Sequence, residues 1–187
     1  IEAARDSMPE RTFRQEYLAE FIDDAGAVFR NIDACLTAPK TTPAAHSGHS
    51  IYMGVDWGKQ ADYTVMSLYC ATCGHEVHLD RTNKIDYAFQ RQRLAGLVKD
   101  WGVGSILAEQ NAMGEPIIEE LQRTGLPVEG FQTTAVSKPP LIESLVLAFE
   151  REEARWLPAQ IAKAELQAYE RKANPKTGRV QYSAPSG

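Results

Sequence analysis

Long apolar runs are absent from this sequence of 187 residues, and none approaches the roughly 18 consecutive apolar residues of a membrane-spanning helix. Residues 1–10 are charged and contain no apolar core, which excludes a secretory signal peptide. The phosphate-binding pattern Gly-x-x-x-x-Gly-Lys-Ser/Thr is also missing, which excludes a P-loop within this segment. The lack of apolar runs predicts no membrane partner. The sequence begins without Met, so we expect it to be a piece of a longer protein.

Cysteine and positive charge are scarce as well. The three cysteines are an odd number and follow no secretion signal, which predicts a reducing compartment and no disulfide framework. Lys and Arg number 20 against 25 Asp and Glu, which gives a formal net charge of −5. Because nucleic-acid binding depends on Lys and Arg beside phosphates, this balance argues against a stand-alone DNA-binding module. An acidic domain can still act on DNA if its carboxylates hold divalent cations.

The composition is otherwise that of a soluble globular protein, with 43 % hydrophobic and 24 % charged residues. We expect residues 1–50 to be a linker or helical segment and residues 51–187 to be the folded domain. Phe13, Tyr17 and Phe21 recur every four residues, which predicts a helix with an aromatic face for docking or core packing.

The order of the expected elements indicates the fold class. After a loop over 37–50, three strand candidates follow closely over 51–55, 63–69 and 75–79, as in an antiparallel meander. The pattern then alternates between helical and strand periods. The later expected elements are a helix ending near 102, a strand over 105–109, a helix over 116–123, a strand over 127–131, helices around 141–149 and over 161–171, and a strand over 179–182. This order predicts an α/β fold with a mixed sheet flanked by helices, the strand order of RNase H-like folds.

Two carboxylates stand at the ends of predicted apolar strands. Asp56 follows the run 51–55, and Gly58 after it allows a tight exit from the strand. Glu109 ends a second apolar run in the same way, where a buried carboxylate is costly unless it is paired or bound to a metal. Taken alone, Asp56 could equally belong to a simple turn, and Glu109 could cap the next helix or lie in a loop. Trp57 could pack beneath a site or simply belong to the core.

Taken together, the two acids predict a metal site. Carboxylates at the ends of neighbouring strands can converge on hard cations such as Mg²⁺ or Mn²⁺. Two such ions roughly 3.5–4 Å apart can activate a water and stabilise the leaving oxygen of a phosphodiester. Asp56 and Glu109 therefore indicate metal-dependent phosphodiester hydrolysis.

The run from Cys70 to His78 contains four potential zinc ligands. Cys70 and Cys73 form a common half-site, but zinc sites usually take their second pair from farther along the chain. This run also falls between two predicted strands. We therefore expect a hairpin tip with free thiols rather than bound zinc.

Three further segments resemble the terminase large-subunit family of viral DNA-packaging motors. In chain order, they resemble the stretch leading out of the packaging ATPase, a strand-to-helix connection of the nuclease core, and the stretch before the last catalytic acid. The segments are FRQEYLAEF (13–21) with VF (28–29), TTAVSK (133–138) with LIE (141–143), and TGRVQY (177–182) with PSG (185–187).

The resemblance implies an RNase H-like nuclease domain that cuts concatemeric double-stranded viral DNA when packaging starts and ends. It matches Asp56 to the first metal-binding Asp, Glu109 to the second acid and Asp62 to an acidic position after the first strand. The third acid of the family is expected beyond Gly187, so the domain is predicted to be truncated and its activity reduced.

The resemblance also implies partners and a location. The partners are double-stranded viral DNA, an upstream packaging ATPase domain of the same polypeptide, the small terminase subunit and the portal. The location is the cytoplasm of a bacterial host. Separately, one lysine near the expected site could contact the scissile phosphate, although a lone lysine is more often simply solvated. Four basic residues around a later turn could contact the DNA backbone, and a solvated basic loop explains them equally well. The lysine is Lys138, and the four residues around the turn are Arg171, Lys172, Lys176 and Arg179.

Three other functions remain open from the sequence. Another RNase H-like nuclease, of the resolvase or integrase type, would share the acids but not the TTAVSK segment. An actin-like kinase or ATPase would use Asp56-Trp57-Gly58 for metal-nucleotide phosphates, but it needs a second Gly-rich loop and about twice this length. A non-catalytic adaptor would be held together by zinc at Cys70 and Cys73.

Overall fold

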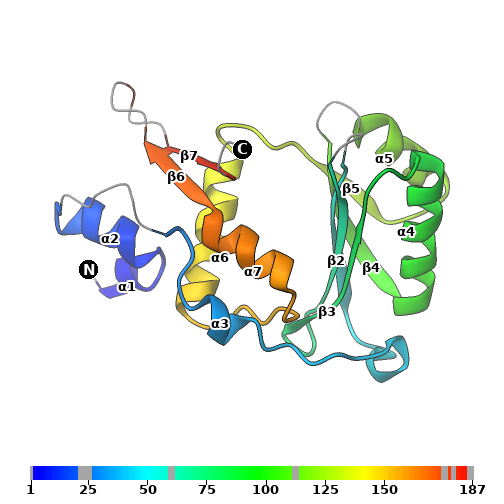
Figure 1. The fold of residues 1–187 in the computed structure, drawn as a ribbon, viewed down its shortest axis with the longest axis horizontal. Coiled ribbons are helices and arrows are strands. Elements are labelled where there is room, and N and C mark those ends of the chain that lie inside the picture. The colour runs from blue at the N-terminus through cyan, green and yellow to red at the C-terminus, as the bar shows by residue number, and fades with distance from the viewer. Residues whose placement is uncertain are drawn as a thin grey trace. The chain divides into compact units, whose positions relative to one another are not determined.

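The computed structural model describes residues 2–20, 27–58, 62–110, 114–173, 177 and 180–184. The chain divides into two compact units (Figure 1). The sheet unit is Ala38–Thr133, and the helical unit combines Ile1–Thr37 with Thr134–Gly187. These units are defined by which residues pack together and do not test where one domain ends and the next begins. The expected domain boundary between residues 50 and 51 therefore stays a prediction.

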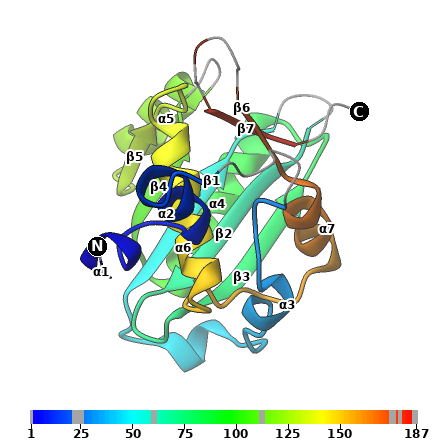
Figure 2. The same ribbon diagram turned by 90° about the vertical axis from the view of Figure 1, so that its left-hand side faces the viewer.

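The sheet unit is built on five strands in the order β3-β2-β1-β4-β5. β1 pairs antiparallel with β2, which pairs antiparallel with β3, whereas β4 is parallel to both β1 and β5. Figure 2 shows β1 between β2 and β4. The strands are β1 (Ile51–Asp56), β2 (Thr64–Cys70), β3 (His75–Thr82), β4 (Val103–Glu109) and β5 (Val128–Phe131). The predicted mixed sheet, a meander followed by parallel strands, is confirmed.

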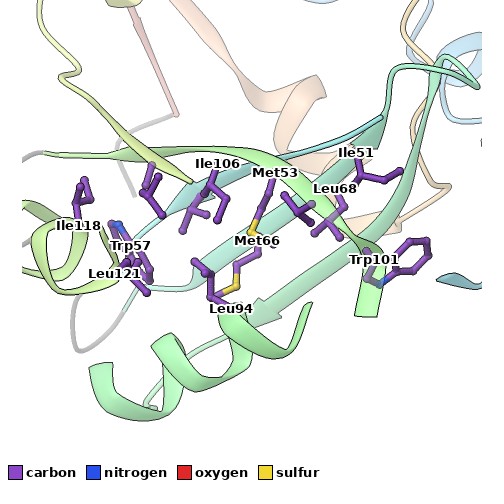
Figure 3. Close-up of a cluster of buried hydrophobic side chains, with 14 of the residues drawn as sticks. Ile51, Met53, Trp57, Met66, Leu68, Leu94, Trp101, Ile106, Ile118 and Leu121 are labelled. Carbon is purple, nitrogen blue, oxygen red and sulfur yellow. The ribbon is translucent and has the colours of Figure 1, made fainter. Parts of the chain in front are cut away.

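One face of this sheet is covered by α4 (Tyr87–Trp101) and α5 (Gly114–Arg123). Side chains in β1 alternate between buried and exposed, because successive residues of a strand point to opposite faces. Its buried members face Leu94 of α4 and Ile118 of α5 in one continuous apolar core (Figure 3). Leu94 and Ile106 are fully buried, and each such side chain contributes about 1.5–3 kcal/mol relative to an exposed one.

Local signals define the limits of α4. The Asp86 carboxylate accepts a hydrogen bond from the Phe89 N–H at 3.0 Å and so caps the first turn. Gly102 ends the helix in the left-handed region, with φ of 64°. The helix end predicted near residue 102 is confirmed.

The helical unit has its own core, in which Phe149 packs against Phe29 and Trp156 with ring centroids 5.3 Å apart in both pairs. Its elements are α1 (Glu2–Arg5), α2 (Glu10–Tyr17), α3 (Ile32–Cys35), α6 (Lys138–Glu150), α7 (Gln160–Ala168), β6 (Glu170–Ala173) and β7 (Val180–Ser183). Among the residues described, no helix has both the length and the apolar character to cross a bilayer.

Two expectations for the helical unit need comment. The helix predicted over 161–171 is wrong at its end, because α7 stops at Ala168 and β6 pairs antiparallel with β7. The aromatic face of α2 is confirmed for Phe13 and Tyr17, whose rings stack with centroids 5.3 Å apart. Phe21 lies outside the described residues.

Candidate active site

The two predicted acids lie at the ends of adjacent strands. β1 and β4 run parallel, and their last register pair is Val55 with Ala108. Asp56 and Glu109 are the next residue on each strand and the last residue of each. Because neighbouring strands lie about 4.8 Å apart, both acids are brought to one short stretch of the sheet edge.

Both acids also belong to the same face of the sheet. Val55 and Ala108 are buried in the core beneath α4 and α5. Since side chains alternate along a strand, Asp56 and Glu109 lie on the face opposite that core. Asp56 is exposed and Glu109 is partly buried, and both make interactions with other groups of the protein. Two carboxylates held this close favour a bound cation, because their mutual repulsion is then relieved.

The turn that follows Asp56 is fixed by buried polar side chains. Gly58 donates its N–H to Thr64 Oγ1 at 2.9 Å, and that hydroxyl donates to Gln90 Oε1 at 2.9 Å. Gln90 in turn donates to the Ile85 carbonyl at 3.0 Å. Thr64 is 1 % exposed and Gln90 3 %, so these bonds are shielded from water. They connect the exit of β1 to the start of α4 and fix the path of the chain just after Asp56.

Replacing Thr64 with Val tests this network. The substitution keeps the shape but leaves the Gly58 N–H and the Gln90 carbonyl oxygen without their partner. An unpaired buried polar group costs about 1–3 kcal/mol, so the free energy of unfolding is expected to fall by that amount in urea denaturation. Thr82 faces Thr64 across β2 and β3, and its buried hydroxyl has no hydrogen-bond partner among the described residues. Thr82→Val is therefore the matched control: it removes a buried hydroxyl that has no partner, so stability should stay the same or rise. Equal losses in both variants would contradict the network.

Glycine permits close packing around both acids. A Cβ on Gly58 would meet the Asp62 carbonyl oxygen and the Thr64 nitrogen at 2.6 Å. A Cβ on Gly114, the first residue of α5, would collide with the Glu109 carbonyl oxygen and lie 3.3 Å from Trp57 Cδ1. Trp57 is 8 % exposed and belongs to the core cluster, so it packs beneath this edge. The backbone that carries both acids is thus fixed from below by Trp57 and α5.

Asp62 lies in the bend before β2 and is exposed. β1 and β2 are antiparallel with Asp56 opposite Val65, so Asp62 is near the same end of the sheet. Within the described residues, Asp62 does not join Asp56 and Glu109 in a common group of three potential metal ligands. Two carboxylates suit a hard divalent cation such as Mg²⁺ or Mn²⁺, but such a cation takes further ligands from water or other groups. The third acid expected beyond Gly187 therefore stays a prediction.

Three of the five basic candidates lie in described parts of the helical unit. Lys138 is the first residue of α6, and its ammonium is 5.8 Å from the centroid of the Tyr169 ring. Lys172 on β6 pairs with Glu170 at 2.7 Å. Arg171 lies beside Tyr182, whose pKa is raised mainly by burial and further by Glu143, and the guanidinium partly opposes that rise. Lys176 and Arg179 lie outside the described residues.

Sequence reasoning missed the groups that hold the acids in place. Thr64, Gln90 and Gly114 carry no motif, and their roles depend on contacts made only after folding. A weak signal was available for Gly114, because a glycine at the first turn of a helix is poor for helix stability and indicates a close approach.

Comparisons with known proteins give the same assignment as the fold. The terminase large subunit of Thermus virus P23-45 is 31 % identical over 152 residues, which are 77 % of this chain and 31 % of that protein. The chain thus spans about a third of the length of the curated relatives it matches. No protein-family model matches the chain.

Solved structures agree in fold. The large terminase nuclease of thermophilic phage G20c with bound magnesium superposes with a TM-score of 0.76 at 24 % identity, over 88 % of this chain and 90 % of that one. The large terminase of thermophilic bacteriophage D6E superposes with a TM-score of 0.72 at 15 % identity, over 97 % of this chain and 47 % of that one. The chain belongs to the terminase large-subunit family and has the RNase H-like fold of its nuclease domain.

Proposed function

We propose that this chain is the nuclease domain of a phage DNA-packaging motor and hydrolyses phosphodiester bonds of double-stranded DNA with divalent cations. The observation that carries the proposal is the placement of Asp56 and Glu109. They are the last residues of the parallel strands β1 and β4, one residue past the last register pair, and both lie on the same face of the sheet. Relatives matched at 30–31 % identity are terminase large subunits, and a nuclease of this fold binds magnesium.

The residues supply position and charge for this reaction. Asp56 and Glu109 would hold two Mg²⁺ or Mn²⁺ ions at the sheet edge, with Asp62 as a further acid nearby. Bound ions of this kind lower the pKa of a water and neutralise charge on the phosphate and on the leaving oxygen. The hydrogen bonds of Thr64 and Gln90 would fix the backbone just after Asp56, and the close approach of Gly114 would fix the backbone at Glu109. A metal site needs its ligands held in place in this way.

Most of the contacts to DNA would come from basic residues and not from Asp56 and Glu109. With a net charge of −5, the chain has little general attraction for phosphates, so weak binding to DNA is expected in isolation. Lys138, Arg171, Lys172, Lys176 and Arg179 are the proposed backbone contacts. Phosphate contacts carry no base information, so these residues would position DNA without selecting a sequence.

The wider assembly follows from the family. We infer an ATPase domain upstream in the same polypeptide, residues 1–50 being its connection to the nuclease domain, residues 51–187. A small terminase subunit and the portal would complete the motor in the bacterial cytoplasm. The motor would cut concatemeric viral DNA at the start and at the end of packaging.

The direct test is plasmid nicking, comparing the wild-type protein with Glu109→Gln. Mn²⁺ or Mg²⁺ should support conversion of supercoiled to relaxed and linear DNA, EDTA should abolish it, and Glu109→Gln should lower the rate at least about 100-fold. Glu119, an exposed residue of α5, provides the control Glu119→Gln, which should cut at the wild-type rate. A version extended past Gly187 should cut faster. Absence of cleavage by every version, extended included, would refute the nuclease.

A further inference from the structure

A second group of potential metal ligands lies in the sheet unit, far from the acid pair. We call it the His–Cys cluster. Among the described residues it is the one place where three or more His, Cys, Asp or Glu side chains are placed to share an ion, with their ligand atoms all within 4.8 Å of one another. The cluster consists of His46, His49, Cys70 and Cys73.

Two short segments build the cluster. His46 ends the 3₁₀ helix η1 (Pro43–His46), and His49 follows three residues later. Cys70 is the last residue of β2, and Cys73 lies in the turn to β3. This turn is tight, since the Gly74 N–H donates to the Cys70 carbonyl at 2.8 Å and Gly74 has a φ of 71°.

The spacing of the ligand atoms is that of a tetrahedral metal site. Cys73 Sγ lies 3.3 Å from His49 Nδ1 and 3.7 Å from His46 Nδ1, and Cys70 Sγ lies 3.6 Å from His49 Nδ1. With zinc–sulfur bonds of about 2.3 Å and zinc–nitrogen bonds of about 2.0–2.1 Å, a tetrahedral angle places sulfur and nitrogen about 3.5 Å apart. A single thiol proton on Cys73 could not serve both imidazole nitrogens, whereas one metal ion would satisfy all four side chains.

Groups around the cluster orient the ligands. His46 is 5 % exposed, and its Nε2 lies 3.0 Å from Thr41 Oγ1. With the proton on Nε2, the ring donates to Thr41 and directs its Nδ1 lone pair at the sulfurs. The Cys73 N–H donates to Cys70 Sγ at 3.3 Å, which fixes the position of this sulfur within the turn.

We propose that the His–Cys cluster binds one zinc ion with a structural role. Two sulfurs and two imidazole nitrogens suit zinc rather than Mg²⁺ or Mn²⁺, which prefer oxygen. Four protein ligands complete the tetrahedron and leave no open position for substrate. The sequence argument against zinc looked for the second ligand pair downstream of Cys73, whereas the structure brings His46 and His49 to the cysteines from upstream, out of the segment expected to be a loop.

The position of the cluster explains what the ion would do. Cys70 is opposite Ile51 at the start of β1, and Asp56 is at its other end. Five strand steps separate the two ends, roughly 17 Å, so this zinc is distinct from the proposed catalytic ions. It would tie the segment before β1 to the β2–β3 turn, where hydrogen bonds from Ala71 to Ser50 and from Ser50 to Thr72 already run.

Metal analysis of the purified protein tests the proposal. We expect close to one zinc per chain by plasma mass spectrometry, and on replacement by Co²⁺ a sulfur-to-cobalt charge-transfer band. Removing zinc should lower the melting temperature by at least about 5 °C. Cys70→Ser and His49→Ala should lose the ion, while Cys35→Ser, a free cysteine of the helical unit, and His78→Ala should keep it.

Two results would overturn the proposal. The first is protein that neither contains zinc after growth in zinc-supplemented medium nor binds added Zn²⁺ or Co²⁺. The second is zinc that persists in Cys70→Ser but disappears in Asp56→Asn, which would place the ion at the acid pair. If Cys70→Ser does not fold, the cobalt spectrum of the wild-type protein decides, because only sulfur ligands give the charge-transfer band.

Discussion

Asp56→Asn is expected to reduce metal-dependent DNA cleavage at least about 100-fold without unfolding the protein. Asn keeps the size of the side chain and removes its charge, so the site loses a ligand at the end of β1 while the strand register is unchanged. The melting temperature in EDTA separates loss of activity from loss of stability, since the variant is compared with the wild-type protein when neither has metal at the acid pair. A melting temperature close to the wild-type value would show that the lost activity comes from the missing ligand.

The same variant should lose its response to metal. A ligand present at 100 times its dissociation constant stabilises the folded state by about 2.7 kcal/mol, so Mn²⁺ should raise the melting temperature of the wild-type protein. Asp56→Asn should show little of this rise. Glu129→Gln, an exposed carboxylate of β5, is the control that should keep both the rise and the cleavage. Full cleavage by Asp56→Asn, together with a normal response to Mn²⁺, would remove Asp56 from the site.

Much of the sheet unit could be predicted because its strands are short apolar runs that end at polar turns. The acids at 56 and 109 were visible for the same reason, and the parallel pairing of β1 with β4 brings them to one edge. β6 was not predictable, because its residues Glu170–Ala173 are polar and helix-favouring, and only pairing with β7 makes them a strand.

The His–Cys cluster shows a different limit of sequence reasoning. Cys70 and Cys73 formed a recognisable half-site, but His49 lies 21 residues before Cys70, in a segment that contains Pro39, Pro43 and Gly48. The two halves meet only because β1 and β2 form an antiparallel pair that returns the chain to its starting end. Ligand spacing along the sequence therefore does not reveal this grouping, which depends on the pairing of β1 with β2.

Gly114→Ala is expected to damage the acid pair from beneath. The added Cβ would meet the Glu109 carbonyl oxygen and lie 3.0 Å from the Glu109 carbonyl carbon, both of them backbone atoms that cannot rotate away. Overpacking of this kind costs about 1–3 kcal/mol, which urea denaturation should show. A shift of Glu109 by about 1 Å can reduce a rate by 100-fold, so cleavage should fall about 10- to 100-fold.

Gly96→Ala is the matched control, because Gly96 lies in α4 with no atom within 4 Å of an added Cβ. Alanine is the better helix former, so this variant should be more stable by about 0.5–1 kcal/mol and cut DNA normally. If Gly114→Ala instead gains stability and keeps its activity, the close approach of α5 to Glu109 does not position the carboxylate. If Gly114→Ala is less stable but cuts DNA at the normal rate, the packing of α5 contributes to stability and not to catalysis. The strands alone would then position Asp56 and Glu109.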